Sequence, residues 1–104
     1  MSVFLRRVLV LSASVLCLQW LVTSAHASDD HPGKAPYDRV CRVCHGPEGR
    51  GNQGPRLIPF ERDADELLVQ VREGSGEMPP ISENRVSDDE VKQIAAYLKS
   101  LSEQ

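Results

Sequence analysis

The chain has 104 residues, of which 40% are hydrophobic and 26% are charged, and its formal net charge is −3. This acidic balance argues against nucleic acid as a partner, because nucleic-acid-binding domains present a basic face. Composition excludes little else, so local patterns along the chain decide what can be said of fold and function.

Residues 1–27 have the three parts of a secretory signal peptide. Arg6 and Arg7 form a positive region, residues 8–22 are mostly apolar, and an Ala-His-Ala cleavage site ends at Ala27. We therefore expect cleavage after Ala27 and export to the periplasm.

Two other fates of this N-terminal segment fit its sequence less well. An uncleaved membrane anchor needs an apolar stretch of about 20 residues, and this stretch is shorter. Lipid attachment through Cys17 needs a small residue before the cysteine, where the chain has Leu16. We accordingly expect no stable membrane insertion once the signal peptide is removed.

The remaining domain, residues 28–104, is small and more acidic. It has 10 Lys and Arg against 15 Asp and Glu, a net charge of −5, and it keeps two cysteines. A domain of this size buries only about 60% of its unfolded surface and needs a disulfide, a metal or a cofactor to stabilise it. Cys41 and Cys44 are so close that a disulfide between them would constrain almost nothing, whereas a buried cofactor would supply the missing core.

The first predicted element of this domain is a helix that begins near Lys34, with Pro36 tolerated in its first turn. Helical spacing brings four residues toward one side: Tyr37, Val40, Cys41 and Cys44. Residues 46–60 follow, with glycine and proline at a density that neither helix nor strand tolerates. A loop this long in a compact domain usually has a function, and wrapping one edge of a flat cofactor would be such a function.

A second helix is predicted over residues 63–73. Asp63 can cap it, Glu66 lies three residues further on, and Gly74 stops it. Its apolar stripe consists of Leu67, Leu68 and Val71.

The last helix follows a second irregular stretch, residues 74–86. Ser87 and Glu90 form a capping box that starts it. Its apolar residues recur with a helical period: Val91, Ile94, Ala95, Leu98 and Leu101. Because no segment alternates as a strand would, we predict an all-α fold of three or four short helices and long Gly/Pro-rich loops.

The motif Cys-Arg-Val-Cys-His, residues 41–45, points to a specific cofactor. Two cysteines at this spacing with a histidine directly after them form the attachment motif of haem c. Both sulfurs reach the vinyl groups on one edge of the porphyrin, and the histidine becomes the proximal iron ligand. The motif thus predicts one haem c, covalently attached at Cys41 and Cys44, with His45 on the iron.

Two alternatives exist for the same motif. A zinc site needs four ligands, but residues 28–104 contain only two cysteines and two histidines, and Cys44 and His45 are adjacent. A redox dithiol usually lies near a βαβ pattern, and none is present. Haem attachment explains the motif better than either alternative.

The domain resembles class I cytochromes c of the small bacterial periplasmic type. The resemblance rests on Gly33 and Tyr37, the segment 41–46, Gly54-Pro55-x-Leu57, Met78-Pro79 and Tyr97-Leu98. It implies a cytochrome c-like fold around one haem c, with the first and last helices in contact. It also implies that Met78 is the second axial ligand of the iron and that the Pro55 carbonyl accepts a hydrogen bond from His45.

The surroundings of Met78 agree with a ligand role. The alternative is that methionine merely fills a gap in the core. Met78 is, however, the only methionine of residues 28–104, and it lies in a Gly/Pro-rich loop with two prolines behind it. A His/Met pair raises the reduction potential compared with two histidines, and it leaves the iron no vacant position for a substrate.

Other polar residues have less specific interpretations. Arg50, Arg56 or Arg62 could pair with a haem propionate, but exposed solvating charge explains each of them equally well. His31 is an alternative ligand, although a solvated surface position in the acidic N-terminal arm explains it better. The acidic run 88–90 is accounted for by the positive end of the last helix.

We therefore expect an electron carrier rather than an enzyme. It would accept one electron from a dehydrogenase or oxidoreductase and pass it to a terminal acceptor in short-lived complexes. One alternative is a permanent cytochrome subunit of a larger periplasmic oxidoreductase. A third is a haem-based ligand sensor or peroxidase-like enzyme, in which Met78 does not bind the iron.

Overall fold

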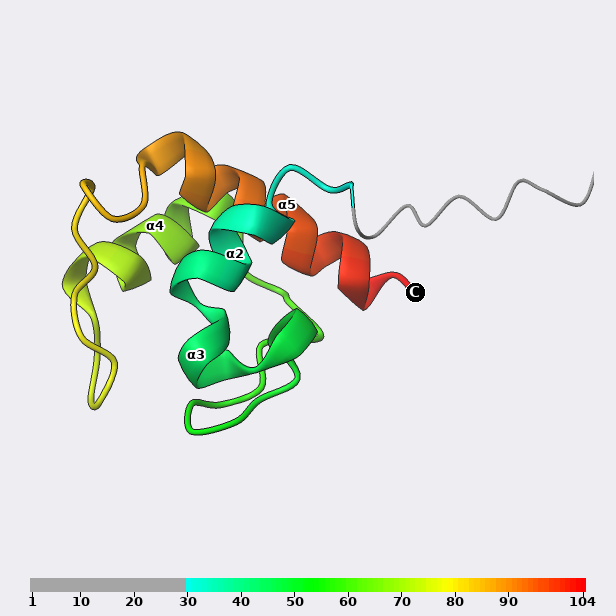
Figure 1. The fold of residues 1–104 in the computed structure, drawn as a ribbon, viewed down its shortest axis with the longest axis horizontal. Coiled ribbons are helices and arrows are strands. Elements are labelled where there is room, and N and C mark those ends of the chain that lie inside the picture. The colour runs from blue at the N-terminus through cyan, green and yellow to red at the C-terminus, as the bar shows by residue number, and fades with distance from the viewer. Residues whose placement is uncertain (1–29) are drawn as a thin grey trace, which may run out of the picture.

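The structure is a computed structural model that describes residues 30–104. The predicted signal peptide, its cleavage site and Cys17 lie outside these residues. The described chain forms the helices α2 (Lys34–Val40), α3 (Arg42–His45), α4 (Ala64–Glu73) and α5 (Asp88–Ser102), with a 3-10 helix η2 (Pro47–Gly49) after α3 (Figure 1). Within residues 30–104 no strand forms, and the only bridge joins Ser75 to Met78. The all-α prediction is therefore confirmed.

Both predicted caps are present. In α4 the Asp63 side chain accepts from the Glu66 backbone, and in α5 the Ser87 side chain accepts from the Glu90 backbone. In each pair the glutamate side chain accepts a hydrogen bond from the backbone N–H of the cap residue. A hydrogen bond from the Ser87 backbone N–H and one from the Arg39 guanidinium lower the pKa of Glu90. These bonds satisfy backbone donors that a helix leaves without partners at its start.

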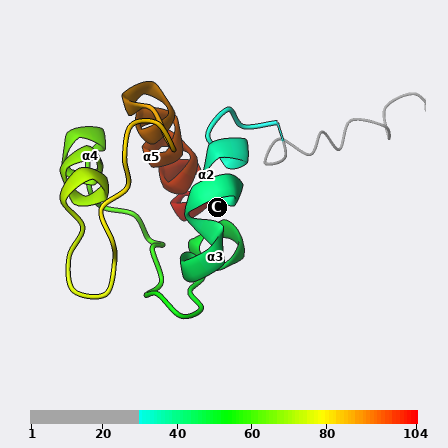
Figure 2. The same cartoon turned by 60° about the vertical axis from the view of Figure 1, so that its left-hand side comes forward.

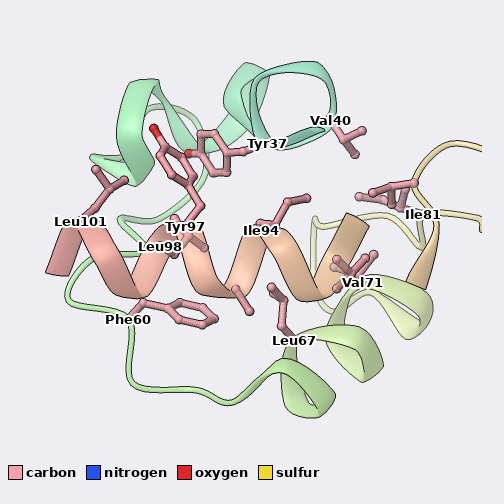
Figure 3. Packing of buried hydrophobic residues seen from close by; sticks show 13 residues of the cluster. Tyr37, Val40, Phe60, Leu67, Val71, Ile81, Ile94, Tyr97, Leu98 and Leu101 are labelled. Atoms are coloured by element: carbon pink, nitrogen blue, oxygen red, sulfur yellow. The ribbon is translucent and has the colours of Figure 1, made fainter. Parts of the chain in front are cut away.

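Helix α5 is the centre of the core, because α2, α4 and η2 all pack against it. Figure 3 shows Tyr37 of α2 against one side of α5, and Leu67 of α4 with Phe60 against another. All five residues of the predicted stripe of α5 are buried, and so is Tyr97. A helix enclosed on two sides needs this wider apolar surface.

The predicted contact between the first and last helices is confirmed at Gly33, Tyr37 and Tyr97. A Cβ atom at Gly33 would lie 2.0 Å from the backbone oxygen of Gln93 and 2.7 Å from Cβ of Tyr97. The rings of Tyr37 and Tyr97 pack with their centroids 5.7 Å apart and tilted by 57°, an arrangement that aromatic pairs favour. Glycine thus lets α2 approach the backbone of α5 directly.

The prediction that one continuous helix carries both cysteines is wrong. A turn at Cys41 separates α2 from α3, so the helical spacing no longer applies beyond that residue. Tyr37 and Val40 are buried as expected, but Cys41 is only half-buried and Cys44 is exposed. The turn directs the second cysteine away from the core.

Figures 1 and 2 show how the loops are placed around this core. Helix α3 and the loop of residues 74–86 project to the same side of α5, apart from each other. The segment leading into α2 and the C-terminus both lie at the end of the molecule opposite that loop (Figure 1). None of the helices in residues 30–104 is both long and apolar enough to cross a bilayer.

Candidate functional site

The two predicted attachment cysteines lie at the junction of α2 and α3. Both are free thiols, and the half-buried Cys41 packs against the hydrophobic core. Burial raises the pKa of the Cys41 thiol to about 11, with a further contribution from the charge of Cys44. Reactive dithiols have lowered thiol pKa values, and the shift at Cys41 has the opposite direction.

Among residues 30–104, no group of three or more His, Cys, Asp or Glu side chains lies close enough together to hold a metal ion. Structural zinc sites need four such ligands.

The imidazole of His45 is oriented by Pro55. Its Nδ1 lies 2.8 Å from the Pro55 carbonyl oxygen. A carbonyl oxygen can only accept, so Nδ1 carries the hydrogen, and in the neutral ring Nε2 then keeps its lone pair. Gly54 lies against the same ring, since a Cβ atom there would be 3.2 Å from Nδ1 and Cε1 of His45. The ring is thereby held in the tautomer that a metal ligand requires.

The loop of residues 46–60 folds back on α3. The backbone N–H groups of Gly51 and Gly54 donate to the carbonyl oxygens of His45 and Cys44, both at 2.7 Å. The Tyr37 hydroxyl, whose pKa burial raises to about 12, donates to the Gly46 carbonyl at 2.7 Å. The glycine-rich loop is therefore tied by its backbone to the end of α3, beside the His45 ring.

Met78 lies in a tight turn after α4. Its backbone exchanges two hydrogen bonds with Ser75, of 2.9 and 3.1 Å. Gly74 allows this turn to close, because a Cβ atom there would lie 2.5 Å from the Met78 carbonyl oxygen. The Met78 side chain is half-buried against the core.

Arg72 holds the rest of this loop against α4. Its guanidinium donates to the carbonyl oxygens of Ile81 at 3.0 Å and Val86 at 2.9 Å, and it pairs with Asp88 at the start of α5. One side chain thus ties the loop to two helices. The sequence analysis missed Arg72, because nothing in local spacing distinguishes it from a solvated cation.

These residues together fit a flat, apolar ring bearing an iron. At the edge of the core lie half-buried apolar side chains, among them Cys41, Leu57, Ile58, Leu68 and Met78. The donor set comprises two free thiols, an imidazole with Nε2 available, and a thioether. The segments that carry His45 and Met78 project to the same side of α5 (Figures 1 and 2).

Comparison with known proteins decides the family. Residues 28–98 match the family described as cytochrome C oxidase, cbb3-type, subunit III. The chain is a c-type cytochrome. It is 37% identical over 101 residues to the cytochrome c subunit of 4-cresol dehydrogenase (hydroxylating) from Pseudomonas putida, covering 92% of this chain and 85% of that protein.

A second relative of this cytochrome is a cytochrome c-553-like protein of Synechocystis sp. (strain ATCC 27184 / PCC 6803 / Kazusa). The two are 32% identical over 75 residues, or 70% of each chain. No solved structure matches the chain. Membership of the family shows that the cytochrome carries haem c covalently and takes part in electron transfer.

Two expectations for individual residues need correction or detail. His31 is not a solvated surface residue: its ring packs on Tyr97 at a centroid distance of 5.4 Å, and its Nδ1 accepts from the Gly33 backbone.

The three candidate arginines are exposed, and each has a local partner. Arg50 pairs with Glu48, Arg56 donates to the Ile58 carbonyl, and Arg62 donates to Gln70.

Gln70 also escaped the sequence analysis. Its amide Nε2 lies 3.7 Å from Sδ of Met78 and 2.8 Å from Oγ of Ser75. The sequence did indicate that Gln70 faces inward, because it lies three residues after the buried Leu67 and so shares a helical face with it.

Proposed function

We propose that this cytochrome is a periplasmic one-electron carrier. Its haem c is attached through Cys41 and Cys44, and the iron has His45 and Met78 as axial ligands. The observation that carries the proposal is the contact of His45 Nδ1 with the Pro55 carbonyl, because it leaves Nε2 available directly after the attachment motif. Bound haem c supplies the one-electron couple.

The protein groups tune and protect that couple. The bond to Pro55 raises the basicity of the His45 imidazole and fixes its orientation. A thioether from Met78 favours the ferrous state and raises the reduction potential compared with a second imidazole. With both positions filled, the cytochrome transfers electrons but offers no position for a substrate, which favours a carrier over a peroxidase-like enzyme.

The surface suggests how partners are met. Val43, between the two cysteines, is 72% exposed, so a partner protein can reach the surface beside the attachment motif. Charge is uneven: residues 30–60 have five Lys and Arg against three Asp and Glu, and residues 61–104 have five against eleven. We propose that the partners are a donor dehydrogenase and a terminal acceptor. Each would present a basic docking surface to the acidic residues 61–104.

Export of the chain with haem-attachment machinery tests the site. The purified protein should show a haem spectrum that survives denaturation, and a mass equal to residues 28–104 plus one haem. The double variant C41A/C44A should lose the covalent haem, because no sulfur remains to bond the vinyl groups. V43A, which alters only the exposed residue between the cysteines, should keep it. A folded but colourless wild-type protein would overturn the proposal.

The second candidate is a permanent cytochrome subunit, favoured by the likeness to the cytochrome c subunit of 4-cresol dehydrogenase. Gel filtration of a native extract separates the two. A free carrier should elute near its own mass, and its reaction with a partner should slow as salt rises, because transient redox complexes rely on electrostatic steering. Co-elution with a larger protein that has dehydrogenase activity would instead identify a subunit.

A further inference from the structure

The side-chain amide of Gln70 is held in one orientation by its neighbours. Its Oε1 accepts a hydrogen bond from the Arg62 guanidinium at 3.2 Å. Since a guanidinium only donates, the amide oxygen must face Arg62, and the NH₂ group must face the other way. That group donates to Oγ of Ser75 at 2.8 Å and to Sδ of Met78 at 3.7 Å.

The backbone around Met78 leaves little freedom except at its side chain. The paired bonds with Ser75 fix the turn, and the Ile81 N–H donates to the Val71 carbonyl at 2.8 Å. Arg72 holds the Ile81 carbonyl from α4 as well. The backbone is therefore fixed, and the contact with Gln70 affects the direction in which the thioether sulfur of Met78 points.

We propose that Gln70 is a positioning residue that orients the Met78 sulfur and raises the reduction potential of the haem. The inference rests on the proposed function, in which Met78 binds the iron. A thioether sulfur has two lone pairs, and an N–H group on one of them leaves the other for the metal. The same hydrogen bond withdraws electron density from the sulfur, which weakens its donation to ferric iron more than to ferrous iron.

Ser75 shares the same amide group and so gives the proposal a second variant. In Ser75→Ala the hydroxyl is lost, and the Gln70 N–H groups have only the sulfur as a neighbouring acceptor. The potential should then stay the same or rise. In Gln70→Leu no donor remains, and the potential should fall. A fall in Gln70→Leu without a fall in Ser75→Ala would not follow from loosened packing alone.

The test is an equilibrium redox titration of the holoprotein, with the ferric far-red band and the NMR shifts of the Met78 side chain as further readouts. Gln70→Leu should lower the potential and move the Met78 resonances while the band is retained. Gln70→Glu, which keeps the acceptor for Arg62 but loses the donor, should do the same. The exposed Gln93→Leu on α5 serves as the control and should change neither readout.

Two negative results are distinguishable. If wild-type protein shows the far-red band, and Gln70→Leu leaves both the potential and the Met78 resonances unchanged, the proposal for Gln70 is wrong and the ligand assignment stands. If the wild-type protein lacks the band, Met78 is not on the iron, and both proposals are wrong.

Discussion

Met78→Leu should remove the weak far-red absorption band of the ferric protein and lower its reduction potential. The band reports sulfur on ferric iron, and leucine has no atom that can replace it. Axial ligands as a class shift haem potentials over roughly 0.8 V, and the thioether lies at the high end of that range. The potential should therefore fall by a substantial part of that range.

Leucine is chosen because it separates ligation from packing. Met78 is half-buried against the core, and exchange of methionine for leucine usually costs less than about 1.5 kcal/mol. The packing change alone should thus affect unfolding little, and a larger loss of stability that accompanies the changed spectrum would report the lost iron–sulfur bond. Val69→Leu, at an exposed position of α4, is the control and should keep the band. A band that persists in Met78→Leu would exclude Met78 as the ligand and favour the sensor or enzyme alternative.

Gly33→Ala should be the most destabilising small substitution in the described chain. The added methyl group would lie 2.0 Å from a backbone oxygen of α5 and 2.7 Å from Cβ of Tyr97. Neither atom is the end of a flexible side chain, so α2 must move away from α5. Overpacking costs about 1–3 kcal/mol, and a clash with backbone atoms should lie at the upper end of that range, a large fraction of the stability of a small domain.

Denaturant unfolding of the ferric holoprotein measures this loss. Gly76→Ala is the matched control, because a Cβ atom at Gly76 would have no neighbour within 4 Å. Its positive φ of 54° still makes alanine unfavourable by about 1 kcal/mol. Gly33→Ala should therefore cost clearly more than Gly76→Ala. Equal stabilities would mean that the close approach of α2 to α5 is not needed for folding.

Local sequence signals predicted the helices well, because each depends on neighbouring residues. Asp63 with Glu66, and Ser87 with Glu90, are capping pairs whose partners lie three residues apart, and both form. The stripe of α5 follows from helical period alone. Family resemblance supplied the long-range contact of Gly33 with Tyr97, which no local pattern contains.

Features set by tertiary contacts were not predictable in this way. The turn at Cys41, which exposes Cys44, interrupts a segment whose spacing suits one continuous helix. His31 lies in a polar arm, and only the ring of Tyr97, far along the chain, explains why it is packed. For the site, the motif predicted the attachment residues, while the contact of Gln70 with Met78 and the bonds of Arg72 to the loop depend on how the loop returns to α4.

The location of the C-terminus has a practical consequence for electrochemistry. Because the C-terminus lies at the end of the molecule opposite the loop of residues 74–86 (Figure 1), a linker added after Gln104 would anchor the protein to a gold surface with that loop facing the solution. Diffusing mediators would then reach the loop side unhindered. Electrons that tunnel from the gold surface would have to pass along the length of the helices.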